Sequence, residues 1–136
     1  GLSRPRLAHF GMATHQFISD ADVIAQARAE DTTRAVQAMR KAHWLGRLDG
    51  AIVGIGNAPT ALIELVRLIR EEGVRPALVV AMPVGFVSAA ESKDLMMTVP
   101  EVPWVAIKGR KGGSTLVVAA IHAMLSLAEA EQKKAA

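Results

Sequence analysis

Cysteine and tyrosine are both absent from the 136 residues, and aromatic residues make up only 4% of the chain. Without cysteine the chain can form no disulfide, no thiolate nucleophile and no thiolate metal site. A nucleic-acid surface commonly stacks bases on aromatic side chains set among basic ones, and this chain has few aromatics although its net charge is +3. We therefore expect no nucleic-acid partner, and the scattered basic residues favour small anionic ligands.

The chain also has no uninterrupted apolar run of the roughly 18 residues that a membrane helix needs, so we expect no membrane association. No secretory signal is recognisable at the N-terminus, which makes the cytoplasm the expected location. The first residue is Gly1 and not methionine, so we expect that sequence upstream was removed or not included. None of the four histidines stands three or four residues from another, so we expect no metal site.

Hydrophobic residues are abundant, at 51% of the chain with a mean hydropathy of +0.25. The length predicts a single domain over residues 1–136. A parallel sheet covered on both faces explains the apolar content, because its strands are continuous apolar runs. Burial of part of this surface by another chain or by a further segment is the alternative.

Three apolar runs pass through a glycine-containing loop into a helical pattern. The predicted strands are 51–55, 77–82 and 104–108, and the helices that follow them are 59–72, 88–97 and one that starts at 114. Asn57 and Ser114 are the expected N-caps, and Ser88 with Glu91 forms an expected capping box. Right-handed crossovers place all three loops at one edge of a parallel sheet. The fold class is therefore α/β, and ligands of such sheets bind at this edge.

The first 45 residues carry weaker signals. We expect residues 1–10 to be irregular and residues 12–18 to form an edge strand, with helices over 20–29 and 31–45. In that strand His15 would share a half-buried face with Phe17. His43 lies on the apolar stripe of the second helix and is expected to be a packed helix-end residue.

The loops suit an anionic ligand, although two common phosphate motifs are absent. GIGNAP has Pro59 where a dinucleotide fingerprint needs glycine or alanine, and GRKGGST lacks the ending of a P-loop. Helix N-termini together with Lys108, Arg110 and Lys111 could hold several carboxylates or phosphates. The same caps and glycine turns also occur in any α/β domain, so both interpretations stay open at this point.

Five stretches of the chain carry a family resemblance, the three loop sequences most strongly and two nearer the N-terminus more faintly. They are GNAPTAL at 56–62, MPVGFVSAAESK at 82–93, KGRKGGS at 108–114, GLSRPRL at 1–7 and Thr33–Arg34. In this order and spacing they resemble the precorrin-8X methylmutases, which are called cobalt-precorrin-8 methylmutases in the anaerobic route to cobalamin.

The resemblance implies a three-layer αβα sandwich with a mainly parallel sheet, a homodimer and no cofactor. The implied reaction moves a methyl group from C11 to C12 of precorrin-8X or cobalt-precorrin-8, which gives hydrogenobyrinic or cobyrinic acid. The acetate and propionate groups of this substrate are the polyanion that the loops would hold. The implied substrate contacts, together with the expected loop contacts, are Ser3, Arg4, Thr33, Arg34, Asn57, Lys108 and Arg110.

The catalytic proton donor of the family is a histidine in an N-terminal segment, within a helix that ends V-H-x-x-G. That segment would lie upstream of residue 1, so we expect no catalytic residue among His9, His15, His43 and His122. We expect that the chain is a C-terminal part of such a domain, that the N-terminal part is a separate polypeptide, or that the protein is a shortened relative. A non-catalytic tetrapyrrole-binding relative and a phosphate- or nucleotide-binding α/β domain are the alternative functions.

Overall fold

The structure is a computed structural model that describes residues 1–135. Apolar runs form short strands, and a glycine-containing loop connects each strand to the helix that follows it. Strand and helix therefore alternate after residue 51. In chain order the elements are α1 (Arg4–His9), α2 (Ala21–Glu30), α3 (Arg34–Trp44), β1 (Ile52–Ile55), α4 (Pro59–Glu72), β2 (Leu78–Ala81), α5 (Ala89–Met97), β3 (Trp104–Ala106) and α6 (Ser114–Ala135).

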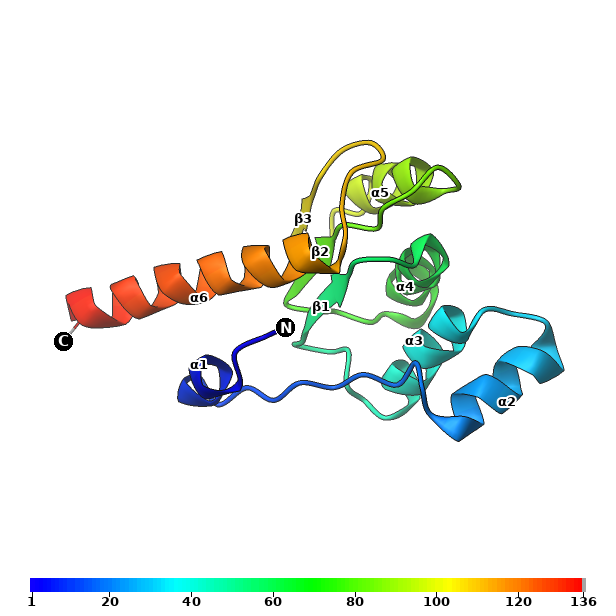
Figure 1. The fold of residues 1–136 in the computed structure, drawn as a ribbon, viewed down its shortest axis with the longest axis horizontal. Helices are drawn as coiled ribbons and strands as arrows, with labels where there is room; N and C mark the ends of the chain where they lie inside the picture. The colour runs from blue at the N-terminus through cyan, green and yellow to red at the C-terminus, as the bar shows by residue number, and fades with distance from the viewer. Residues whose placement is uncertain (136) are drawn as a thin grey trace.

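The three strands form one parallel sheet in the order β1-β2-β3, with Val53 opposite Val79 and Val79 opposite Trp104. The helices α3, α4 and α5 lie on one side of this sheet, and α6 lies on the other side with α1 beside it (Figure 1). The fold is therefore α/β with a helical layer on each face of a parallel sheet, as expected. The predicted strands and their helices are confirmed to within one or two residues.

Each face of the sheet has its own core. The larger core fills the space between the sheet and α3, α4 and α5, and Leu62, Leu65 and Met96 are completely buried in it. The smaller core lies under α1 and α6 and includes Leu7, Val117 and Ile121. Because helices cover both faces of the sheet, the strands are continuous apolar runs and do not alternate between apolar and polar residues.

Two predictions for the N-terminal region are wrong. Residues 4–9 are not irregular, because Ser3 caps a short helix whose first turn accepts Pro5. Residues 12–17 have no regular secondary structure, Ile18 lies in a turn, and the segment pairs with no strand among residues 1–135. His15 does stack on Phe17, with ring centroids 6.4 Å apart, but it is exposed and not half-buried.

The last helix, α6, has much of its surface in solvent and projects beyond the body of the molecule (Figure 1). By length and composition it is long and apolar enough to cross a membrane, although core helices of soluble proteins pass the same test. Its first half covers β1 and β2, and its polar second half holds α1 through an ion pair from Arg6 to Glu129 at 2.9 Å.

Candidate functional site

The loops that follow the three strands meet at one edge of the sheet. The backbone N–H of Gly113 donates to the carbonyl oxygen of Met82 at 2.8 Å, which ties the loop after β3 to the end of β2. A Cβ on Gly112 would overlap that same Met82 carbonyl, so only glycine allows the two backbones to approach this closely. The expected gathering of these two loops is confirmed.

The loop after β1 joins the same cluster. The side-chain amide of Asn57 donates to the hydroxyl oxygen of Ser114 at 3.1 Å, and a Cβ on Gly56 would lie only 2.6 Å from the Cα of Ser114. Neither residue is the N-cap that the sequence predicted. Ala58 occupies the cap position of α4, and the carbonyl of Gly113 accepts the first hydrogen bonds of α6. The two polar side chains bond to each other because the loops approach so closely.

The loop after β2 carries exposed apolar residues beside a cation. Phe86 is 83% exposed, and the guanidinium of Arg110 lies 5.2 Å from the centre of its ring. The N–H of Gly85 donates to the carbonyl of Arg110 at 3.1 Å. The capping box predicted for this loop is wrong, because Ser88 adopts a left-handed conformation with φ 63° and makes no cap hydrogen bond.

Lys93 is a residue that sequence reasoning missed. It lies on α5 and is completely buried, and its ammonium group donates to the carbonyl of Lys111 at 2.7 Å. Burial lowers the pKa of Lys93, and the nearby charge of Asp94 acts in the opposite direction. Lys93 closes the MPVGFVSAAESK stretch, but a lysine at the centre of a helix is usually solvated, so no pattern marked it as buried.

Thr33 and Arg34 reach the site from α3. Thr33 caps this helix by accepting from the N–H of Val36, and its hydroxyl lies 3.0 Å from the hydroxyl of Thr60 in the first turn of α4. Arg34 is the first residue of α3 and is exposed. The structure therefore brings the Thr33–Arg34 pair next to the start of α4.

Ser3 and Arg4 lie farther from the loops. The N–H of Ser3 donates to Nε2 of His122 at 3.0 Å, so α1 begins beside the middle of α6. His122 follows Ser114 by eight residues, which is about 12 Å along a helix at 1.5 Å per residue. Ser3 and Arg4 are thus not gathered with Asn57, and their role as substrate contacts stays a prediction.

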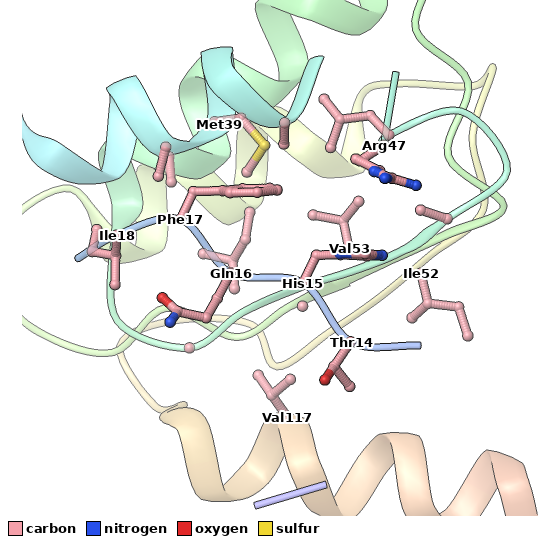
Figure 2. A pocket seen from close by; sticks show the side chains of 18 of the residues that line it. Thr14, His15, Gln16, Phe17, Ile18, Met39, Arg47, Ile52, Val53 and Val117 are labelled. Atoms are coloured by element: carbon pink, nitrogen blue, oxygen red, sulfur yellow. The ribbon is translucent and has the colours of Figure 1, made fainter. Parts of the chain in front are cut away.

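The histidines do not form a catalytic group at the loops. His9 is 2.8 Å from Gln132, His122 accepts from Ser3, and His43 is half-buried near the end of α3, as predicted. His15 is exposed on residues 12–18, and it lines an open groove (Figure 2) that Asn57 and Ser114 also border. Among residues 1–135, no group of histidine and acidic side chains is arranged to hold a metal ion.

The chemical capacity of this edge is anion binding. Lys108, Arg110 and Lys111 are exposed on the loop that leads from β3 to Ser114, and Ser114 bonds to Asn57. Guanidinium and ammonium groups near helix N-termini bind carboxylates and phosphates. Within the described chain these side chains can bind and orient a polyanion, and they offer no histidine as proton donor.

Comparison with known proteins identifies the family. A family model described as precorrin-8X methylmutase matches residues 1–127. The chain is 48% identical over 132 residues to the cobalt-precorrin-8 methylmutase of Leptospira interrogans, and 43% identical over 108 residues to the precorrin-8X methylmutase of Pseudomonas aeruginosa. These matches cover 93% and 79% of this chain.

A solved structure agrees with these sequence matches. The precorrin-8X methylmutase of Thermus thermophilus superposes with a TM-score of 0.84 at 54% identity over 94% of this chain. The chain spans only 60% of that structure, 60% of the Leptospira relative and 51% of the Pseudomonas relative. By the extent of the family match and the identity to these proteins, the chain belongs to the precorrin-8X methylmutase family.

Proposed function

We propose that this protein serves the methyl migration of corrin-ring biosynthesis, as an isomerase that moves a methyl group from C11 to C12. The substrate is precorrin-8X or cobalt-precorrin-8, and no cofactor takes part. The observation that carries the proposal is the joining of the three strand-end loops through Asn57, Ser114 and Met82 beside exposed cations. Such a rim suits a ring whose edge carries many carboxylates.

In this proposal the site residues divide into two roles. Lys108, Arg110 and Arg34 bind carboxylates of the substrate, while Asn57, Thr33, Ser3 and Arg4 orient it through hydrogen bonds and charge. The proton that assists the shift comes from the histidine of the family's N-terminal segment and from none of the histidines of residues 1–135. The working unit is a cytoplasmic homodimer without a nucleic-acid or membrane partner. Large exposed apolar residues on α6, Leu116 and Leu127, support a contact between two copies.

A second candidate function is corrin binding without conversion. It is favoured by the positions of three histidines, since His9 and His122 are engaged between α1 and α6 and His43 lies near the end of α3. A module of this kind would bind the ring and leave the methyl group at C11.

Incubation of precorrin-8X with the protein, to which the family's N-terminal segment is added, distinguishes the candidates, because that segment holds the proton donor of the proposed reaction. Appearance of the orange spectrum of hydrogenobyrinic acid is the expected result for the isomerase. Binding of precorrin-8X with an unchanged spectrum indicates the non-catalytic module. Failure to bind either precorrin-8X or hydrogenobyrinic acid would reject both and favour a phosphate- or nucleotide-binding domain.

A further inference from the structure

His122 of α6 joins this helix to the start of α1, which lies beside it (Figure 1). Its ring nitrogen Nε2 accepts from the backbone N–H of Ser3 at 3.0 Å, across 119 positions of the chain. Its backbone carbonyl accepts from the guanidinium of Arg6 at 3.2 Å. The ring is half-buried. The side chain of His122 therefore fixes the residue that begins α1, whereas its backbone holds a residue farther along the same helix.

The hydrogen bond to Ser3 requires a neutral imidazole. A backbone N–H can only donate, so Nε2 of His122 accepts with its lone pair and the ring proton lies on Nδ1. A protonated ring carries N–H on both nitrogens, and two donors would then face each other. The second histidine contact between these helices differs, because His9 meets the side chain oxygen of Gln132 at 2.8 Å and can donate to it in either charge state. Protonation therefore breaks the contact of His122 and not that of His9.

Charged groups reach this junction from both helices. Arg6 and Glu129 pair with each other at 2.9 Å, and Arg4 is exposed on α1. The strands contribute apolar side chains to the core under α1 and α6. Histidine is the side chain that ordinarily changes its charge between about pH 5 and 8, and α-amino groups such as that of Gly1 also titrate there. Acidification through this range thus leaves the pair of Arg6 and Glu129 charged.

The rest of α1 has anchors that do not depend on the imidazole. Leu7 is buried in the core under α6, with 4% of its surface exposed, and the guanidinium of Arg6 also donates to the hydroxyl of Ser126 at 2.8 Å. The N–H of Met12 donates to the carbonyl of Leu7 at 2.9 Å and closes the far end of the helix. Loss of the bond from Ser3 should therefore loosen the first turn of α1 and leave the helix docked.

We propose that His122 is a positioning residue, which in its neutral form holds Ser3 and Arg4 in place for a polyanionic ligand and releases them when it is protonated. The consequence for the ligand rests on the proposed function, in which Ser3 and Arg4 orient the substrate, whereas the loosening of α1 does not. Affinity for a corrinoid should then fall on acidification. Simple electrostatics predicts the opposite, because an added positive charge that touched a polyanion would strengthen binding.

Amide exchange measured by NMR tests the structural part. The rate at Ser3 is divided by that of an unstructured peptide at the same pH, and the ring signals of His122 report its protonation. We expect the protection of Ser3 to fall by about three- to tenfold as the ring is protonated between about pH 8 and 5.5, because one hydrogen bond is lost. Protection of Met12 should stay constant. Constant protection of Ser3 while the ring titrates would overturn the proposal.

Matched variants separate the imidazole from every other titrating group. His122→Gln keeps an acceptor close to the place of Nε2 and has no charge to gain, so the protection of Ser3 should be independent of pH. His122→Leu has no acceptor and should give weak protection at every pH. His9→Gln removes the other histidine of this junction and should preserve the pH dependence. All three variants keep Gly1, so a pH dependence that survives in His122→Gln would assign the effect to the terminal amino group and overturn the proposal.

Binding of hydrogenobyrinic acid, followed by its absorbance, tests the consequence. Affinity should weaken by about threefold or more from about pH 8 to about pH 6, a range in which the ligand's carboxylates stay charged. His122→Gln should bind equally well at both values, and His122→Leu should bind weakly at both. Tighter binding at the lower pH would show that the charged ring touches the ligand, and would overturn the positioning role. Loss of Ser3 protection in acid without corrinoid binding at any pH would reject the proposed function and support the link from His122 to Ser3.

Discussion

β1 and β2 have equal length and pair with each other, yet they are covered very differently. Val79, Val80 and Ala81 of β2 are completely buried, because β2 has a strand on each edge and a helical layer on each face. In β1 only Ile55 is buried, and Gly54 is exposed beside the open groove of about 640 Å³ that lies between β1 and residues 12–18. Two similar apolar runs thus end in opposite environments.

The same contrast extends through the candidate site. On the β2 side the loops are fixed by backbone hydrogen bonds and by the buried Lys93. On the β1 side, Thr33 and Arg34 stand on α3, and this helix borders the open groove. The difference indicates that the β2 side of the site is held by hydrogen bonds within the described chain, whereas the β1 side borders an open groove.

The largest effect is expected from shortening the two facing valines of these strands. Val79→Ala should lower the free energy of unfolding by about 2–3 kcal/mol, because a fully buried side chain leaves a cavity. Val53 is its partner across the strands but is half-buried and lines the groove, so Val53→Ala should cost about 1 kcal/mol or less. Urea unfolding of both variants gives the two values. Equal losses would show that β1 is covered as well as β2.

A smaller effect is expected at Glu64, which connects α4 to α3. Burial would raise the pKa of this carboxyl, but hydrogen bonds and ion pairs from Arg67 and Arg40 outweigh it and hold the pKa below the ordinary 4.5. A lowered pKa in the folded state means that the carboxylate stabilises the fold above pH 4.5. This contribution is lost as the pH falls through the lower folded pKa.

Glu64→Gln should therefore cost about 1–2 kcal/mol at neutral pH, and the difference from the unchanged protein should vanish in acid. The cost is limited because both arginine side chains are more than one-third exposed, so that solvent screens their charges. Urea unfolding across a pH series measures it. Glu71→Gln is the matched control, because Glu71 also pairs with Arg67 but is exposed, and it should cost much less. A constant Glu64→Gln loss at every pH would contradict the ion-pair explanation.

The sequence was sufficient to predict the elements after residue 51. Apolar runs, glycine turns and helical periodicity are local signals, and they agreed with the sheet that formed. The gathering of the three loops also followed from the sequence, because right-handed crossovers bring the ends of parallel strands to one edge. Lys108 and Arg110 could be placed at that edge for the same reason.

The failures concern interactions between distant residues. Asn57 and Ser114 carry the residue types of caps, but the close approach of two loops joined them to each other instead. Residues 12–18 have a strand-like pattern, but no strand of the described chain lies beside them, and pairing cannot be read from one segment alone. Lys93 is buried because the backbone of Lys111 supplies an acceptor, which the local sequence does not reveal.

Lys93→Met tests whether the β2 side is preformed. The free energy of unfolding should change by no more than about 1 kcal/mol, because loss of the hydrogen bond to Lys111 is offset by relief from burying a charge. The loop should nevertheless loosen, with faster amide exchange at Gly112 and Gly113 and about three- to tenfold weaker binding of hydrogenobyrinic acid. Lys111→Met, which keeps the carbonyl, should preserve slow exchange. Unchanged exchange and binding in Lys93→Met would assign this lysine to packing alone.

The smallest effect on stability is expected for Arg34→Ala, which tests the β1 side of the site. The side chain is exposed at the start of α3, where a positive charge opposes the helix dipole, so its removal should leave the thermal midpoint nearly unchanged. If the guanidinium holds a carboxylate of the ring, binding of hydrogenobyrinic acid, followed by its absorbance, should weaken by about tenfold. Arg28→Ala removes an exposed arginine from α2 and should leave binding unchanged. A lower midpoint with unchanged binding would make Arg34 a structural residue, and the β2 side alone would then hold the ligand.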